Sequence, residues 1–150
     1  MPQYNSTIRF PSDPYYLQII REVIAEMGKL ARLSDKKVRL VTLAVDEACA
    51  NIIRHTYHNE FNHVIEMNCS VTDAYLEFCL VDFGNTIDFS KIKHRDLSDV
   101  RPGGLGTFFM KNIMDKIEYE NRVPRGNLVR LVKYLQVDEP EEPENVEPGA

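Results

Sequence analysis

A long stretch that begins at Ser34 and runs to about His55 or Tyr57 constrains the fold more than any other part of the sequence. Ser34 is a favoured residue for capping the start of a helix. Apolar residues recur behind it at helical spacing: Val38, Leu40, Val41, Leu43, Ala44, Val45, Ala48, Ile52 and Ile53. Because they cover most sides of the predicted helix, we expect it to lie at the centre of the fold.

The patterns on either side of this helix predict a two-layer domain. Helical spacing also indicates a first helix, which Asp13 caps and Pro14 opens. Alternation of apolar and polar residues, with turn residues between the segments, predicts the strands: 3–10, 63–71, 75–82, 116–122 and 128–136. A polar loop over 85–100 is typical of a functional lid or of a disordered stretch, and a short helix ends at Asp115. This order favours an α+β two-layer sandwich, with a mostly antiparallel sheet and helices on one face.

Composition limits the kinds of protein that the chain can be. With 150 residues, 43% hydrophobic and 27% charged, it has the size and balance of one soluble globular domain. No apolar run reaches the roughly 18 residues of a membrane span, and the start lacks a signal-peptide pattern. Each of the three cysteines lies in an apolar stretch. We therefore expect reduced core thiols in a cytoplasmic protein without membrane contact.

The negative net charge comes from the C-terminal end of the chain. The chain has 23 acidic and 18 basic residues, and six of the acidic residues lie within 138–150 together with three prolines. We expect a folded domain over 1–137 and a disordered acidic tail over 138–150. The folded part is then close to neutral, so we expect no direct binding of nucleic acid.

Polar residues interrupt the apolar surface of the central helix. Glu47 and Asn51 are four residues apart and share a face, and His55 continues their line. One interpretation is a hydrogen-bonded polar edge of the core. The alternative is chemical: a carboxylate in an apolar wall can act as a base, and an amide oxygen suits Mg²⁺.

A second polar site follows the strand over 75–82. Asp82 ends the strand, and Gly84 follows two residues later. A carboxylate there can accept a hydrogen bond from an exocyclic amine such as that of adenine. Gly84 lets the backbone approach a flat ring. The same pair is also common in an ordinary strand-ending turn.

A third cluster comes after the predicted lid: Gly103, Gly104, Leu105, Gly106 and Thr107. Glycines just before a helix expose backbone N–H groups at its positive end, which suits phosphate groups. A flexible hinge would need the same residues. No Gly-Lys-Ser/Thr follows, so the loop is not a P-loop, and its position disfavours a dinucleotide-binding fold.

Taken together and in this order, the three clusters resemble the motifs of the GHKL (Bergerat-fold) ATPases. Within that group the chain is similar to the anti-sigma-factor serine kinases of the RsbW type, from the opening strand to Gln136. The segment 47–57 resembles the N-box, 82–84 the DxG box and 103–106 the last glycine box.

The resemblance implies a role for each matching residue. Glu47 is the expected general base and Asn51 the expected Mg²⁺ ligand, while Asp82 reads the adenine amine of ATP or ADP. Further nucleotide contacts are expected from the remaining matching positions: Gly84, Arg101, Gly103, Gly104, Leu105, Gly106, Thr107 and Asn127.

The resemblance also implies a function, for which we keep two hypotheses. The first is an ATP-dependent serine/threonine kinase that acts as an anti-sigma factor and phosphorylates a STAS-type anti-anti-sigma protein. The second is a non-catalytic nucleotide-binding module that sequesters a sigma factor or another regulator. Either form is expected to be a homodimer, with Tyr15, Tyr16 and Ile19 as candidate contacts. A sensor histidine kinase would need a further helix pair, and the histidines and cysteines match no zinc pattern.

Overall fold

The protein is built on one five-stranded antiparallel sheet. The computed structural model describes residues 3–91 and 110–135. The strands of the sheet lie in the order β1-β2-β3-β5-β4, and every neighbouring pair is antiparallel. Their bounds are β1 Tyr4–Pro11, β2 Val64–Val71, β3 Tyr75–Asp82, β4 Lys116–Asn121 and β5 Asn127–Tyr134. The strands predicted from the sequence are therefore confirmed to within a residue or two at most ends.

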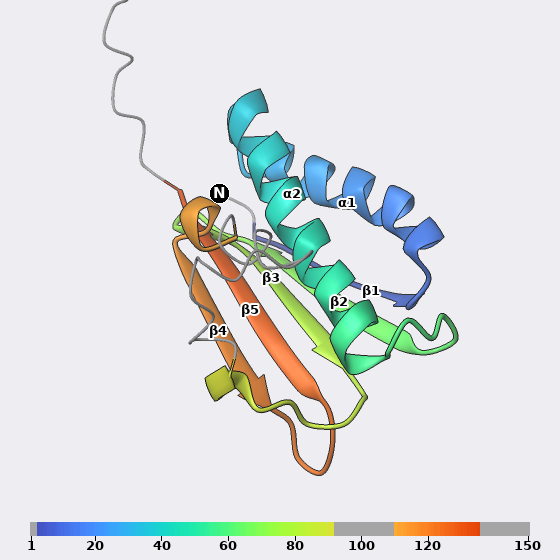
Figure 1. Cartoon of the computed structure of the whole chain (residues 1–150). Coiled ribbons are helices and arrows are strands. Elements are labelled where there is room, and N and C mark those ends of the chain that lie inside the picture. Colours follow the sequence, from blue (N-terminus) through green and yellow to red (C-terminus); the bar gives the residue numbers. More distant parts are fainter. Residues whose placement is uncertain (1–2, 92–109, 136–150) are drawn as a thin grey trace, which may run out of the picture.

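Two long helices cover one face of this sheet (Figure 1). α1 spans Leu17–Leu30 and contacts β2, whereas α2 spans Asp35–Asn51 and contacts β3 and β5. The Ser34 side chain caps α2 by accepting a hydrogen bond from the N–H of Lys37 at 3.2 Å. The α+β two-layer architecture expected from the sequence is confirmed.

The core lies between the helices and the sheet. Alternation along the strands sends one set of side chains into it, since every second residue of β2 from Ile65 to Val71 is buried. The helices supply residues at their own spacing, such as Ile20 and Ile24 of α1 and Val45 of α2. Cys49 and Cys69 are buried free thiols, and burial raises the pKa of Cys69 to about 12. The prediction of core thiols is confirmed for these two, whereas Cys79 is a free thiol that is only partly buried.

Two helical predictions need correction. Leu40 and Leu43 were expected to belong to the apolar surface of the central helix, but they are 38% and 53% exposed. They lie on the side of α2 that faces away from the sheet, so the buried surface of α2 is narrower than predicted. Asp13 does act as a cap, but it caps a single 3-10 turn, Pro14–Tyr16, that precedes α1.

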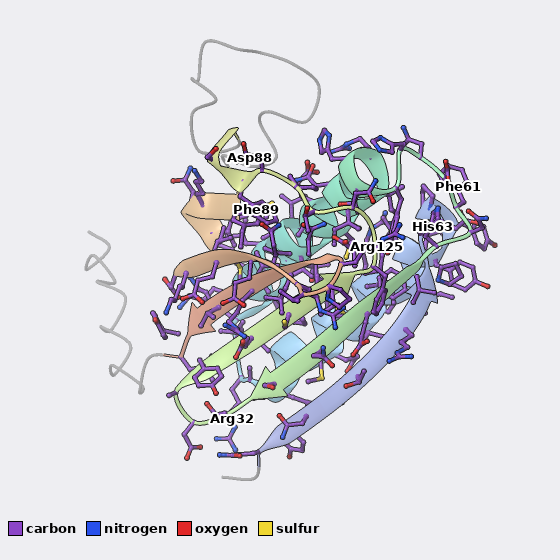
Figure 2. All side chains as sticks on the ribbon, turned by 90° about the horizontal axis from the view of Figure 1, so that it is seen from below. Arg32, Phe61, His63, Asp88, Phe89 and Arg125 are labelled. Carbon is purple, nitrogen blue, oxygen red and sulfur yellow. The ribbon has the colours of Figure 1, made fainter. Side chains whose placement is uncertain are left out.

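Several predictions fall on parts of the chain outside the described residues. These are most of the lid, the glycine cluster 103–106 and the acidic tail 138–150. The described start of the predicted lid contains a 3-10 turn, Phe89–Lys91, in which Figure 2 labels Phe89. The Phe89 ring stacks on that of Tyr119 in β4, with 4.9 Å between the ring centroids. Residues 110–113 are helical, in agreement with the predicted helix before Asp115. In the part of the chain that is described, no helix combines the length and apolar character needed to cross a membrane.

Candidate functional site

Asp82 is a buried carboxylate at the end of β3, with a relative exposure of 2%. Its Oδ1 accepts hydrogen bonds from the N–H of Gly84 at 3.1 Å and from the N–H and Nδ2 of Asn127 at 3.2 and 3.0 Å. Its Oδ2 accepts one bond, from the Thr56 hydroxyl at 3.3 Å. Burial raises the pKa of Asp82 above its ordinary value, and the bonds from Asn127 and Gly84 oppose that rise. Oδ2 is thus the carboxylate oxygen with capacity for a further donor.

Asn127 holds this carboxylate and the following loop in place. It pairs with Asp82 across the β3–β5 ladder, and its Nδ2 also donates to the carbonyl oxygen of Asn85 at 2.9 Å. Its Oδ1 accepts from the N–H of Ile87 at 2.9 Å and from Nδ2 of Asn121 at 3.0 Å. Every donor and acceptor of the Asn127 amide is therefore engaged within the protein. This geometry makes Asn127 a residue that positions Asp82, while the predicted direct contact with a nucleotide stays a prediction.

Two glycines permit the close packing around Asp82. A Cβ atom at Gly84 would lie 2.2 Å from Cγ2 of Thr56, so Thr56 fills the space that a side chain would need. Gly126 has a φ of 107°, and a Cβ atom there would lie 2.3 Å from the Asp82 carbonyl oxygen. Both positions require glycine because of protein atoms beside them.

The end of the central helix reaches the same corner of the sheet. After Asn51 the helix widens into a π-helical turn, Ile52–Thr56, a form that is frequent at functional sites. The turn buries Thr56 beside Asp82. The next residue, Tyr57, donates its hydroxyl to the carbonyl oxygen of Val64 at 2.6 Å and accepts from the N–H of Phe83 at 2.8 Å. Tyr57 thereby links the end of the helix to the start of β2 and to the end of β3.

Glu47 and Asn51 lie on α2 as predicted, and a third residue joins them. Nη2 of Arg54 donates to Oε1 of Glu47 at 3.0 Å and to Oδ1 of Asn51 at 2.7 Å. Nδ2 of Asn51 lies 4.0 Å from Sδ of Met110, the first described residue after the glycine cluster. These contacts join Glu47 and Asn51 through Arg54 and place Asn51 beside Met110.

His55 does not follow the buried side of this helix. The side chain is exposed, whereas its neighbours in the π-helical turn, Ile53 and Thr56, are buried. One interpretation of the sequence was a hydrogen-bonded Glu47–Asn51–His55 edge of the core. In the structure Arg54 donates to both Glu47 and Asn51.

The structure brings together part of the predicted set. Asp82, Gly84 and Asn127 meet at the corner between β3, β5 and the end of the central helix, and Glu47 and Asn51 lie on the helix that leads into it. The other predicted contacts lie outside the described residues: Arg101, Gly103, Gly104, Leu105, Gly106 and Thr107.

Comparison with known proteins identifies this arrangement. Residues 10–133 match the family model of the histidine kinase-like ATPase domain. The chain belongs to this family. The match spans most of the chain and includes all the clusters that carried the resemblance to GHKL ATPases, and so confirms it.

Curated relatives of this histidine kinase-like ATPase domain share a name. The serine-protein kinase RsbW of Bacillus subtilis (strain 168) is 28% identical over 85% of this chain and 84% of its own length. The serine-protein kinase RsbW of Bacillus velezensis is 27% identical over the same shares, and that of Oceanobacillus iheyensis is 23% identical over 88% and 87%. The similarity therefore extends over nearly the whole of each relative.

The donor atoms fit the metal that such ATPase domains imply. Asn51 offers a neutral amide oxygen and Glu47 a partly exposed carboxylate, which are hard oxygen ligands of the kind that Mg²⁺ binds. Mg²⁺ takes few protein ligands and completes its shell with water and phosphate oxygens. Among the described residues, no group of three or more His, Cys, Asp or Glu is placed to hold a metal.

Reasoning from the sequence missed Arg54, Thr56 and Tyr57. Arg54 follows Asn51 by three residues and Glu47 by seven, so helical spacing alone was a usable signal. Thr56 and Tyr57 act through a π-helical turn and through contacts with distant strands. The periodicity of the sequence predicts neither the π-helical turn nor these contacts.

Proposed function

We propose that this chain is an ATP-dependent serine/threonine protein kinase that acts as an anti-sigma factor and phosphorylates a STAS-type anti-anti-sigma protein. The observation that carries the proposal is that one helix bears Glu47 and Asn51 and then ends against the buried Asp82. Membership of the ATPase family and the names of the relatives support the enzyme class.

The adenine end of the nucleotide is assigned to Asp82. From the described residues Oδ2 accepts only the long bond from Thr56, so it can accept a hydrogen bond from the exocyclic amine of adenine. Oδ1 is held by Asn127 and Gly84, which fixes the direction of the carboxylate before the base arrives. Such preorganisation lowers the free-energy cost of binding.

The reacting end is assigned to Glu47 and Asn51. Asn51 would hold Mg²⁺, and the metal supplies neutralisation of phosphate charge when bound. Glu47 accepts the hydroxyl proton of the substrate serine while the serine oxygen forms a bond to the γ-phosphorus. The bond from that phosphorus to the bridging oxygen breaks, and ADP leaves. Arg101, the glycines 103, 104 and 106, Leu105 and Thr107 are proposed to contact the phosphates.

The partners and the assembly belong to the same proposal. Tyr15, Tyr16 and Ile19 are 71%, 40% and 57% exposed at the start of α1, where the proposed homodimer would need accessible apolar side chains. The proposed ligands are ATP or ADP with Mg²⁺, and the proposed protein partners are a sigma factor and its STAS-domain antagonist. We propose a cytoplasmic location.

Phosphoryl transfer tests the catalytic assignment. We expect Glu47→Gln to lose transfer from ATP to a STAS-domain protein of the same organism while it still binds ADP. Glu22→Gln removes an exposed carboxylate of α1 and serves as the matched control, with transfer unchanged. Transfer at the wild-type rate by Glu47→Gln would refute the role of Glu47.

Nucleotide binding tests the site apart from the chemistry. By calorimetry we expect ADP binding that Mg²⁺ strengthens and that Asp82→Asn removes. Lack of any nucleotide binding by the folded wild-type protein would overturn the proposal. Binding of nucleotide and sigma factor without transfer would instead favour the non-catalytic module.

A further inference from the structure

Arg54 occupies the two atoms on which the proposed chemistry depends. A single nitrogen, Nη2, donates to both the Glu47 carboxylate and the Asn51 amide oxygen, at 3.0 and 2.7 Å. The Arg54 side chain is 38% exposed and that of Glu47 is 24% exposed. The guanidinium thus lies at the edge of the site, with part of the side chain exposed to solvent.

One nitrogen of the Arg54 guanidinium is not satisfied among the described residues. Its Nε is buried and has no hydrogen-bond partner among the residues that the structure describes. A buried donor without a partner is unfavourable, because it loses its bonds to water and gains none in return. Arg54 is therefore held by the contacts of Nη2 against a local penalty, which favours its release when those contacts meet competition.

Mg²⁺ and Arg54 cannot both use the Asn51 oxygen well. The guanidinium already lies at contact distance from Oδ1, and a divalent ion bound to that oxygen would be its immediate neighbour. Like charges so close repel strongly in a partly buried site. One of the two cations must therefore give up the oxygen.

We propose that Arg54 is an exchangeable latch, which holds Asn51 and Glu47 together and is released when Mg²⁺ binds with the nucleotide. The inference rests on the roles proposed above for Asn51 and Glu47. Release of Arg54 also frees Oε1 of Glu47 from its hydrogen bond. The base then becomes available when the metal and nucleotide are in place, and is covered by Arg54 otherwise.

The test is the Mg²⁺ concentration that half-saturates the strengthening of ADP binding, measured by calorimetry at fixed ADP. We expect Arg54→Met to lower this concentration about tenfold, equivalent to about 1.4 kcal/mol. Arg54→Lys keeps the positive charge but replaces the planar guanidinium with a flexible ammonium group. We therefore expect a half-saturating Mg²⁺ concentration between those of wild type and Arg54→Met. Arg39→Met is the matched control, because it removes the same charge from the same helix on the order of 20 Å away. We expect no change in that variant.

Opposite results would overturn the latch. If Arg54→Met folds normally and needs as much Mg²⁺ as wild type, Arg54 does not affect the metal ligand. If it needs more Mg²⁺, Arg54 supports the metal ligand. If Arg54→Met fails to fold, the wild-type protein still decides the matter by NMR. We expect the Arg54 Nε–H signal to shift when Mg²⁺ is added to the ADP complex, and an unchanged signal contradicts the proposal.

These measurements separate the latch from the kinase assignment. If Arg54→Met needs less Mg²⁺ than wild type but the wild-type protein transfers no phosphate, the latch stands and the kinase assignment is refuted. If the wild-type protein transfers phosphate and Arg54→Met needs the same Mg²⁺ concentration as wild type, the kinase assignment stands and the latch is refuted. Absence of ADP binding by the folded wild-type protein removes both.

Discussion

The contact between Gly84 and Thr56 yields a prediction that separates packing from ligand binding. The sequence suggested that Gly84 allows a flat ring to approach the backbone. In the structure, however, a Cβ atom at this position would lie 2.2 Å from Cγ2 of Thr56. We therefore expect Gly84→Ala to destabilise the fold itself, in the absence of any nucleotide.

The size of the effect follows from the geometry. Carbon atoms in contact prefer separations of about 3.5–4.0 Å, so the alanine methyl group overlaps Thr56 by more than an ångström. Thr56 cannot move away easily, because it is buried and its hydroxyl bonds Asp82. Overpacking of this kind costs about 1–3 kcal/mol. For a chain of this length, about 2 kcal/mol lowers Tm by roughly 6 °C.

The assay is a double-mutant cycle in urea without nucleotide. Thr56→Ser removes the clashing methyl group, keeps the hydroxyl for Asp82, and alone costs about 0.8 kcal/mol. The double variant is expected to regain about 1–2 kcal/mol relative to the sum of the single effects. If Gly84→Ala is as stable as wild type but binds ADP poorly, the glycine serves the ligand and the packing argument is wrong.

Three further predictions concern unfolding free energies measured by urea denaturation. Burial raises the pKa of Asp82 above 3.8, so folding favours its protonated form and wild-type stability falls as pH rises through that raised value. Asp82→Asn should lack this fall, and an identical pH profile in both proteins would contradict the burial argument. Asn127→Ala should cost about 1–3 kcal/mol, because it leaves buried partners unpaired; a neutral result would show that water replaces the amide. Ser34→Ala should cost about 1 kcal/mol through loss of the cap on α2, and unchanged stability would show that the cap contributes nothing.

Periodicity predicted most of the fold because burial repeats with the geometry of each element. The alternation along 63–71 and 75–82 fixed both the presence of β2 and β3 and the side that they bury. The cap at Ser34 was also visible in the sequence. Where periodicity erred, at Leu40 and Leu43, it counted apolar residues without knowing how much of the helix the sheet can cover.

The candidate site was predictable as a set of residues and not as a set of contacts. Glu47, Asn51 and Asp82 stood out because polar groups in apolar segments need partners. Their partners come from elsewhere: Asn127 lies 45 residues beyond Asp82 and reaches it through the β3–β5 pairing. Only the three-dimensional structure shows that the amide of Asn127 is fully used inside the protein, or that Arg54 covers Asn51.

Two local features that oppose stability lie at one corner of the molecule. Asp82 is a buried carboxylate whose pKa is raised, and beside it the central helix widens into a π-helical turn over 52–56. The core between the helices and the sheet follows the ordinary rules of apolar packing. Unfavourable local features persist where the surroundings hold them and tend to accompany function. Their concentration around Asp82 therefore supports a ligand site at this corner on physical grounds that do not depend on the family motifs.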